Sequence, residues 1–386
     1  MSLVTSRVPE PIGHLRGPRM VAVLDRRALN RATLARQFLL ERVDRPVTDL
    51  VSHLAGLQAQ TTHSWYVAFQ NRLIRPDPEE VGRLLTDGAL VRMSLMRSTL
   101  HLVTPEDARA LRSVTREVMA RDLRNSRHGR ATVGVDHAAV VARGRELLEE
   151  RPLTARELGE RLGEDWPDVP GEHLAYVVRC LLPVVQTPPR GVWGASGRPL
   201  LAPADRWTGL DMEVEPDREG LVLRHLAAFG PASVRDVQAW SGLTRLKAVV
   251  EGMRDRLVSF HDERGVEMFD LPEAPRPGSD VPAPPRFLYD FDNLLRAHAD
   301  RSRVISDEGL RRIAVRNGMP PATVLVDGSV AATWRVLRGT APVVEVAPFA
   351  PLPSGEAERV AEEGLALLAF LRPDRDDGRI EFVTPD

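Results

Sequence analysis

Apolar residues in the first part of the chain change from helical to strand-like spacing. Spacings of three and four residues predict helices over residues 29–40, 47–55, 65–74 and 78–85. The spacing then shortens, and residues 90–103 are typical of strands joined by a polar crest. Helices followed by a β-hairpin are typical of a winged-helix domain, a module that most often binds double-stranded DNA.

The same order of elements recurs in two further copies. In the second copy, the pattern predicts helices over residues 140–150, 153–162 and 173–182 and short strands over residues 184–186 and 192–193. In the third copy, it predicts helices over residues 220–228, 233–240 and 244–256 and a hairpin over residues 257–269. We therefore expect tandem winged-helix units that form a concave DNA-binding scaffold.

A proline-rich connector precedes the end of the chain. Residues 272–285 contain six prolines in fourteen residues, which favours a stiff, non-helical segment. Beyond it the pattern predicts a hairpin with Asp327-Gly328 at its turn, a strand over residues 343–346 and a helix over residues 356–371. The predicted fold class is α+β, mainly α. Its expected parts are a disordered leader (1–26), winged-helix units (27–135, 136–215 and 216–271), a linker (272–285) and a C-terminal mixed α/β module with the β-hairpin (286–386).

Composition narrows the class of protein. No apolar run approaches the roughly 18 to 20 residues that span a membrane, and the N-terminus lacks the pattern of a secretion signal, so we expect a cytoplasmic protein without a membrane partner. The single cysteine, Cys180, excludes an intramolecular disulfide and a cysteine zinc site. Almost all of the 52 cationic side chains are arginines, but the net charge is −2, so any DNA binding depends on local arginine clusters.

A short polar motif follows the second predicted helix. Gly56 suits the end of this helix, and Gln58 and Gln60 follow two positions apart in an extended segment, on the same side of the chain. Two amides in this arrangement can hold one water molecule between them. The alternative interpretation is simple surface polarity, and the motif alone does not decide between the two.

Several segments give the chain a specific resemblance. They are residues 29–37, 56–60, 97–103, 291–301 and 326–328. In this order they resemble the winged-helix DNA glycosylase family typified by AlkZ, which clears crosslinks formed by azinomycin antibiotics. The resemblance extends from about residue 29 to the C-terminus. The bacterial relative YcaQ carries Gln-x-Asp at the functional motif, so Gln60 places this chain nearer the AlkZ branch.

The resemblance implies hydrolysis of the N-glycosidic bond of N7-alkylguanine in double-stranded DNA, including the unhooking of interstrand crosslinks, with no cofactor and no metal. Alkylation at N7 already gives the base a positive charge, so its departure needs no general acid. Gln58 and Gln60 match the family's functional motif and are the implied catalytic residues. An amide is a poor base, but it can position water and stabilise an oxocarbenium-like transition state.

A second group of residues is predicted to contact DNA. Its members are His53, His63, Arg97, Thr99, His101, His298, Arg301, Arg303, Asp327 and Gly328. Strand alternation would place Arg97, Thr99 and His101 on one face of the first wing, either as a phosphate clamp or as a solvated sheet face. The alternative for His53 and His63 is that they are surface or helix-end residues. For the segment that contains Arg301, the alternative is an ion pair between Asp300 and a neighbouring arginine in place of a DNA contact. The turn at Asp327 is expected, from the resemblance, to reach a DNA groove.

Two other functions are compatible with the sequence. A non-catalytic winged-helix regulator, or a drug-sequestering protein, has no need for both glutamines and would bind undamaged DNA or the drug. A bifunctional lyase needs an amine nucleophile, and the only lysine, Lys247, lies in the third unit. The leading hypothesis is a monomeric, monofunctional DNA glycosylase.

Overall fold

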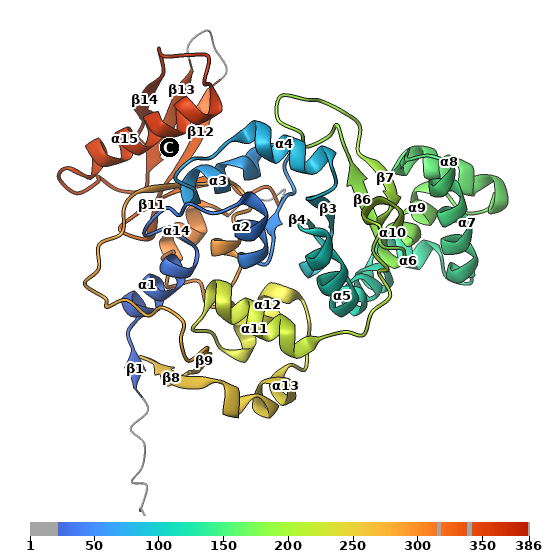
Figure 1. The fold of residues 1–386 in the computed structure, drawn as a ribbon, viewed down its shortest axis with the longest axis horizontal. Helices are drawn as coiled ribbons and strands as arrows, with labels where there is room; N and C mark the ends of the chain where they lie inside the picture. Colours follow the sequence, from blue (N-terminus) through green and yellow to red (C-terminus); the bar gives the residue numbers. More distant parts are fainter. Residues whose placement is uncertain (1–21, 315–317, 338–341, 385–386) are drawn as a thin grey trace, which may run out of the picture.

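Helices and β-hairpins alternate along the chain in the computed structural model, which describes residues 22–314, 318–337 and 342–384 (Figure 1). The first helix–hairpin segment contains β1 (Val23–Leu24), α1 (Arg26–Arg36), α2 (Val47–His53), β2 (Leu57–Gln58), α3 (Val67–Arg72), α4 (Pro78–Thr86), β3 (Val91–Ser94) and β4 (Leu100–Val103). The second contains α5 (Pro105–Asn125), α6 (Arg127–Ala131), α7 (His137–Glu150), β5 (Leu153–Thr154), α8 (Ala155–Asp165), α9 (Gly171–Leu181), β6 (Val184–Thr187), β7 (Leu200–Pro203) and α10 (Ala204–Thr208).

The remainder of the chain adds a third segment and a C-terminal sheet. The third segment contains α11 (Arg218–Phe229), α12 (Val234–Ser241), α13 (Lys247–Gly252), β8 (Val258–Asp262) and β9 (Glu267–Asp270). The C-terminal part contains β10 (Arg286–Leu288), α14 (Asp307–Arg312), β11 (Ala322–Val326), β12 (Ser329–Leu337), β13 (Val343–Pro348), α15 (Glu356–Leu371) and β14 (Arg379–Phe382). This mixture of helices and sheets agrees with the predicted α+β class. None of the described helices has the length and apolar character needed to cross a membrane.

Local sequence fixes the starts of two helices in the repeated segments. Thr154 and Glu157 form a reciprocal capping box at the start of α8. Ser233 and Asp236 form the same arrangement at the start of α12. Each box satisfies backbone N–H groups that the first helical turn leaves without a partner, so the helix begins at a defined residue.

The strands of the first two segments form one continuous sheet in the order β2-β4-β3-β6-β7-β5. Its halves meet where β3 pairs with β6, with Arg92 opposite Gln186 and Met93 opposite Val185. The sequence predicted a separate wing for each unit. Pairing satisfies backbone groups that β3 and β6 would otherwise expose at their edges. As a result, β2, which carries Gln58, is an edge strand of a sheet that extends across both segments.

The first segment contributes to two hydrophobic cores. Its Trp65 and Phe69 pack in one core with Phe287 and Val344 of the C-terminal sheet, whose strand order is β10-β11-β12-β13-β14. Its Met93 lies in a second core with apolar residues of the second and third segments. In Figure 1 the first segment accordingly lies at the centre, between the C-terminal sheet, the second segment and the third.

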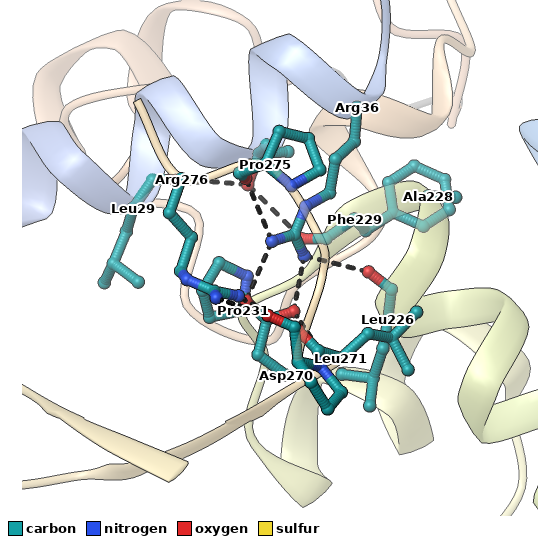
Figure 2. Close-up of polar contacts among 12 residues, drawn as sticks. Leu29, Arg36, Leu226, Ala228, Phe229, Pro231, Asp270, Leu271, Pro275 and Arg276 are labelled. Atoms are coloured by element: carbon teal, nitrogen blue, oxygen red, sulfur yellow. Dashed lines mark hydrogen bonds and ion pairs between the residues drawn. The ribbon is translucent and has the colours of Figure 1, made fainter. Parts of the chain in front are cut away.

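The proline-rich segment after β9 is anchored to α1 by arginine side chains (Figure 2). Arg36 of α1 forms a fully buried ion pair with Asp270, with N–O distances of 2.7 and 2.8 Å. Arg36 also donates to the carbonyls of Leu226 at 2.9 Å and Pro275 at 3.1 Å. Arg276 donates to the same carboxylate at 2.7 Å. One guanidinium therefore joins α1, the third segment and the linker, and removing one partner of such a buried pair typically costs about 3–5 kcal/mol.

The N-terminal boundary differs from the prediction. Residues 1–21 of the predicted leader lie outside the described residues, but Val23–Leu24 form β1, which pairs in parallel with β8. Asp25 caps α1 by accepting a hydrogen bond from the Ala28 N–H at 2.6 Å. The predicted disorder of residues 23–26 is therefore wrong, because strand pairing and a helix cap order them.

Candidate active site

The glutamine motif lies on and just after β2. Gly56 precedes it with a φ of +88°, and a Cβ at this position would lie 2.6 Å from Cγ1 of Val103, so the turn requires glycine. The Asn293 side-chain amide donates to the Gly56 carbonyl at 3.0 Å. Gln58 then pairs with His101 of β4. This turn and this pairing fix where the motif enters the sheet.

The two glutamines differ in their surroundings. Gln58 is only 4% exposed, and its Oε1 accepts a hydrogen bond from Nη2 of Arg97 at 2.7 Å. Gln60 is exposed, and its Oε1 accepts from the backbone N–H of Leu100 at 3.4 Å. Ala59, between them, is fully buried and donates its N–H to the Leu100 carbonyl at 2.8 Å. The motif therefore combines one tightly held amide with one that faces solvent.

Two arginines contact the motif. Arg97 binds the side chain of Gln58, and the buried Arg92 donates from Nη2 to the Ala59 carbonyl at 2.9 Å. Burial, aided for Arg97 by the charge of Arg296, lowers the pKa of each guanidinium to about 10, so both are cations at neutral pH. Within the described ranges, no acidic side chain forms an ion pair with either arginine. The motif thus lies in a positively charged environment, which suits a polyanionic substrate.

His101, opposite Gln58, is fully buried. Its Nδ1–H donates to the Thr99 carbonyl at 2.9 Å, which places the proton on Nδ1. Burial, together with the charge of Arg97, lowers its pKa to about 3. The ring is therefore neutral at physiological pH and cannot supply a proton as a general acid. A ring without exposed surface also cannot touch DNA in this conformation, which contradicts the prediction for His101.

The turn between β3 and β4 differs from the predicted wing crest. Arg97 and Ser98 have φ values of +55° and +61° and belong to a 3₁₀ turn rather than to a strand. Strand alternation is lost, so the predicted common face of the wing residues does not form. Arg97 turns inward, and its Nη1 donates to the Trp240 carbonyl while its Nη2 binds Gln58. Thr99 donates back to the carbonyl of its own turn at 2.9 Å. The predicted phosphate clamp is therefore wrong for this turn.

The segment from 291 to 301 adds a cation that the sequence analysis missed. Arg296 is half-buried, and burial and the charge of Arg301 lower its pKa. Arg301 is half-exposed, and within the described ranges neither arginine has an acidic partner. Asp300 pairs instead with Arg264 of the third segment. The signal for Arg296 was its position inside a segment that carries the family resemblance.

Two residues of the same stretch are buried and structural. His298 is 3% exposed, and its Nε2 contacts the Phe229 carbonyl at 3.0 Å. Arg303 is 6% exposed and donates to the Pro231 carbonyl at 2.9 Å. Side chains with so little exposed surface cannot reach a phosphate in this conformation. The predicted DNA contacts of His298 and Arg303 are therefore wrong.

The two histidines closest in sequence to the motif make contacts within the protein. His53 Nε2 lies 2.8 Å from the Arg36 carbonyl, and its ring packs 4.6 Å from that of Phe38. His63 Nε2 lies 2.8 Å from the Val192 carbonyl in the β6–β7 loop. Burial is the main cause of the lowered pKa of both rings. A DNA contact by either ring stays a prediction, since each is only partly buried.

The Asp327-Gly328 turn forms the predicted hairpin between β11 and β12, but it docks on α1. The Asp327 carboxylate pairs with Arg27 and with the buried Arg31. The Gly328 carbonyl accepts from Asn30 at 2.8 Å, and a Cβ on Gly328 would lie 2.5 Å from the same side chain. The turn is therefore held against α1 with 47% of the Asp327 side chain exposed, and a DNA contact by this turn stays a prediction.

A cavity of about 760 Å³ lies beyond the motif, and its first lining residue along the chain is Ser64, four residues after Gln60. Its lining includes Tyr289, Asp290 and Trp334, and Asp290 accepts hydrogen bonds from the hydroxyls of Thr61 and Ser64. The volume lies in the range of small-molecule sites, about 300–1,000 Å³. Among the described residues, no group of three His, Cys, Asp or Glu side chains is arranged to hold a metal ion.

Comparison with known proteins adds to this geometry. A family model described as DNA glycosylase AlkZ-like matches residues 51–370. An interstrand DNA cross-link repair glycosylase of Streptomyces sahachiroi is 26% identical over 341 residues, which cover 79% of this chain and 86% of that protein. The solved structure of the Streptomyces sahachiroi DNA glycosylase AlkZ superimposes with a TM-score of 0.77 at 21% identity, over 94% of this chain and 100% of that chain. The family match covers most of the sequence and confirms the resemblance, so this chain belongs to the AlkZ-like family of DNA glycosylases.

Proposed function

We propose that this DNA glycosylase hydrolyses the N-glycosidic bond of N7-alkylguanine in double-stranded DNA and unhooks interstrand crosslinks made through that atom. The observation that carries the proposal is the Gln58-x-Gln60 motif, held beside cationic Arg97 and Arg92. The name of the Streptomyces relative, a cross-link repair glycosylase, supports crosslinked DNA as a substrate class. A natural-product crosslink and simple alkylation damage are both members of this class.

The chemistry requires few groups from the protein. Water attacks the anomeric carbon, a C–O bond forms, and the C–N bond to the base breaks. The bonding electrons leave with the base and cancel its positive charge, and the water proton passes to solvent. Gln58 and Gln60 position the water, and the amide oxygen of the exposed Gln60 stabilises the developing positive charge of the sugar. The neutral His101, with a pKa lowered to about 3 by burial and by Arg97, is not needed as an acid.

DNA binding follows from the architecture around the motif. We assign the repeated helix–hairpin segments to winged-helix units that together hold a duplex, with the motif of the first unit against the lesion. Arg296 and Arg301 are the best-placed phosphate partners, because both have exposed surface and no acidic partner among the described residues. The protein acts as a monomer on DNA in the cytoplasm.

The test is release of the modified base by purified protein in the presence of a chelator. Labelled duplexes carry N7-methylguanine or an N7-guanine interstrand crosslink, and the Gln58→Ala, Gln60→Ala double variant is the control. We expect wild-type protein alone to release the base and unhook the crosslink. Tight binding of undamaged DNA without release would favour the alternative, a non-catalytic regulator or drug-sequestering protein.

A further inference from the structure

The β3–β4 turn, residues 95–99, is held by hydrogen bonds to three parts of the molecule. Arg97 donates to Gln58 Oε1 at 2.7 Å and to the carbonyl of Trp240 at the end of α12. Ser98 donates to Asp122 of α5 at 2.8 Å. The same Asp122 oxygen accepts from the hydroxyl of Tyr176 in α9 at 2.7 Å. The second and third segments therefore both fix the turn that contacts the glutamine.

The backbone of this turn is strained. Arg97 and Ser98 are consecutive left-handed residues, with φ values of +55° and +61°, and neither is glycine. Each such residue costs on the order of 1–3 kcal/mol and persists only when its surroundings impose it. Gly242 packs directly on the turn, since a Cβ there would lie 3.2 Å from both N and Cα of Arg97. The surroundings thus impose the conformation that points Arg97 inward.

The hydrogen bond to Arg97 fixes which way the Gln58 amide faces. A guanidinium can only donate, so the atom that meets Arg97 is the Gln58 oxygen, and Nε2 faces away from it. Within the described part of the chain, no residue accepts a hydrogen bond from Nε2. The Gln60 oxygen has a single partner, the N–H of Leu100, at 3.4 Å and keeps a second lone pair. Gln58 therefore presents a donor and Gln60 an acceptor.

We propose that Arg97 is a positioning residue that acts through Gln58: it holds the amide so that the N–H groups of Nε2 face the substrate. The proposal rests on the glycosylase function proposed above. A water that accepts from Gln58 and donates to Gln60 is oriented by both amides and keeps a lone pair for attack. A charge-assisted hydrogen bond to the amide oxygen also makes its N–H a stronger donor. Arg97 itself touches neither water nor sugar.

The test is a double-mutant cycle on the single-turnover rate of base release from duplex containing N7-methylguanine. The proteins are wild type, Arg97→Met, Gln58→Ala and the double variant, at saturating protein concentration. We expect Arg97→Met to slow release by at least about 10-fold, on the scale of removing one preorganised donor. In the Gln58→Ala background the same change is expected to have no further effect, because the group on which Arg97 acts is gone.

Controls separate this role from stability and from phosphate binding. Arg121 donates to the Gly242 carbonyl at the same end of α12 and has no contact with Gln58, so Arg121→Met is expected to keep the wild-type rate. Arg97→Lys keeps the positive charge, but an ammonium lacks the planar pair of donors that binds Gln58 Oε1 and the Trp240 carbonyl together. We therefore expect this variant to retain part of the activity. The Kd for undamaged duplex and its salt dependence are expected to be unchanged in Arg97→Met. Thermal unfolding shows which variants are folded.

Three outcomes are decisive. Equal slowing by Arg97→Met with and without Gln58, or weaker DNA binding with a smaller salt slope, would show that Arg97 acts on DNA and overturn the proposal. If Arg97→Met is unfolded, the folded Arg97→Lys replaces it in the cycle, and a wild-type rate for Arg97→Lys would equally overturn it. Absence of release by wild-type protein refutes the glycosylase function itself, a result that the Arg97 variants cannot produce.

Discussion

The β3–β4 and β8–β9 turns occupy the same place in the first and third helix–hairpin segments, yet they are built differently. The β8–β9 turn takes its left-handed residue from Gly265, with a φ of +78° and open space around it. Its Arg264 is exposed and pairs with Asp262 and Asp300. In the β3–β4 turn, the left-handed residues are instead Arg97 and Ser98, and the Arg97 side chain points inward.

This difference shows how the same topological element serves two purposes. At the third turn, hydrogen bonds to Asp262 and Asp300 raise the pKa of Arg264, and the neutralised cation ties the hairpin to the C-terminal part. At the first turn, burial lowers the pKa of Arg97 to about 10, and its partners are an amide and a carbonyl. Backbone strain and an unneutralised buried charge occur together beside the Gln58 motif, as they do at functional sites.

The largest expected effect concerns the glutamines beside the first turn. Gln58→Ala is expected to slow single-turnover release of N7-methylguanine by about 10- to 1000-fold, if the scale of an oxyanion-hole donor applies here. Gln60→Ala is expected to slow it less, because the Gln60 amide is exposed and held by one hydrogen bond of 3.4 Å. Kd values for undamaged duplex serve as the control. A larger loss for Gln60→Ala than for Gln58→Ala would contradict the special role of the first turn.

A pair of glycine substitutions sharpens the comparison between the turns. Gly242→Ala introduces a Cβ 3.2 Å from the Arg97 backbone at a φ of +80°, so we expect a loss of about 1–3 kcal/mol in unfolding free energy together with slower base release. Gly265→Ala has a φ of +78° but no neighbour within 4 Å, so it is expected to cost about 1–2 kcal/mol and leave the rate unchanged. Urea unfolding and single-turnover kinetics measure both quantities. If Gly265→Ala also slowed base release, the proposed difference between the β3–β4 and β8–β9 turns would be contradicted.

The last expected effect is a pH dependence of stability that arises next to the first turn. Burial and Arg97 lower the pKa of His101 to about 3, so below the unfolded-state pKa of about 6.5 only the unfolded chain binds this proton. Its share of stability is complete above pH 6.5 and is lost as pH falls toward 3, by up to about 1.4 kcal/mol per pH unit. His101→Gln is expected to flatten the unfolding free energy between pH 6 and 4 by this amount. Burial lowers the pKa of His225 to about 4, so this residue makes its own contribution to the pH dependence of stability in wild type and variant alike. An unfolding free energy that depends on pH equally in both proteins would argue against a neutral, buried His101.

Local patterns in the sequence predicted the elements that carry the site. Apolar periodicity placed most helices and hairpins, and the helix over residues 356–371 matches α15, Glu356–Leu371. The strand predicted over residues 192–193 is wrong, because β6 pairs with β7 at Leu200–Pro203. Turn chemistry placed the hairpin turn at Asp327-Gly328, and Gly56 marked the end of the α2 turn before Gln58 and Gln60. The family resemblance, confirmed over residues 51–370, assigned a chemistry to the motif that periodicity alone could not.

The wrong predictions share one cause. Arg97, His298 and Arg303 are polar residues that sequence analysis places by default on a surface, but each meets carbonyls from distant parts of the chain and is turned inward or buried. The Asp327 turn pairs with arginines of α1, a contact that its sequence did not indicate, while its DNA contact stays a prediction. Charge and residue type show that a side chain can bind something; they do not identify its partner.

By itself, the sequence determined the succession of helices and hairpins, the α+β class and the motif Gln58-x-Gln60, because apolar periodicity and turn chemistry act over a few neighbouring residues. Tertiary structure alone decided that β3 joins β6 in one sheet, that Arg97 fixes the Gln58 amide and that the Asp327 turn docks on α1. The contacts of Arg97 with Gln58 and Trp240 span 39 and 143 positions, and that of Arg31 with Asp327 spans 296. Such partners meet only when the cores between them have formed, so no local pattern contains them.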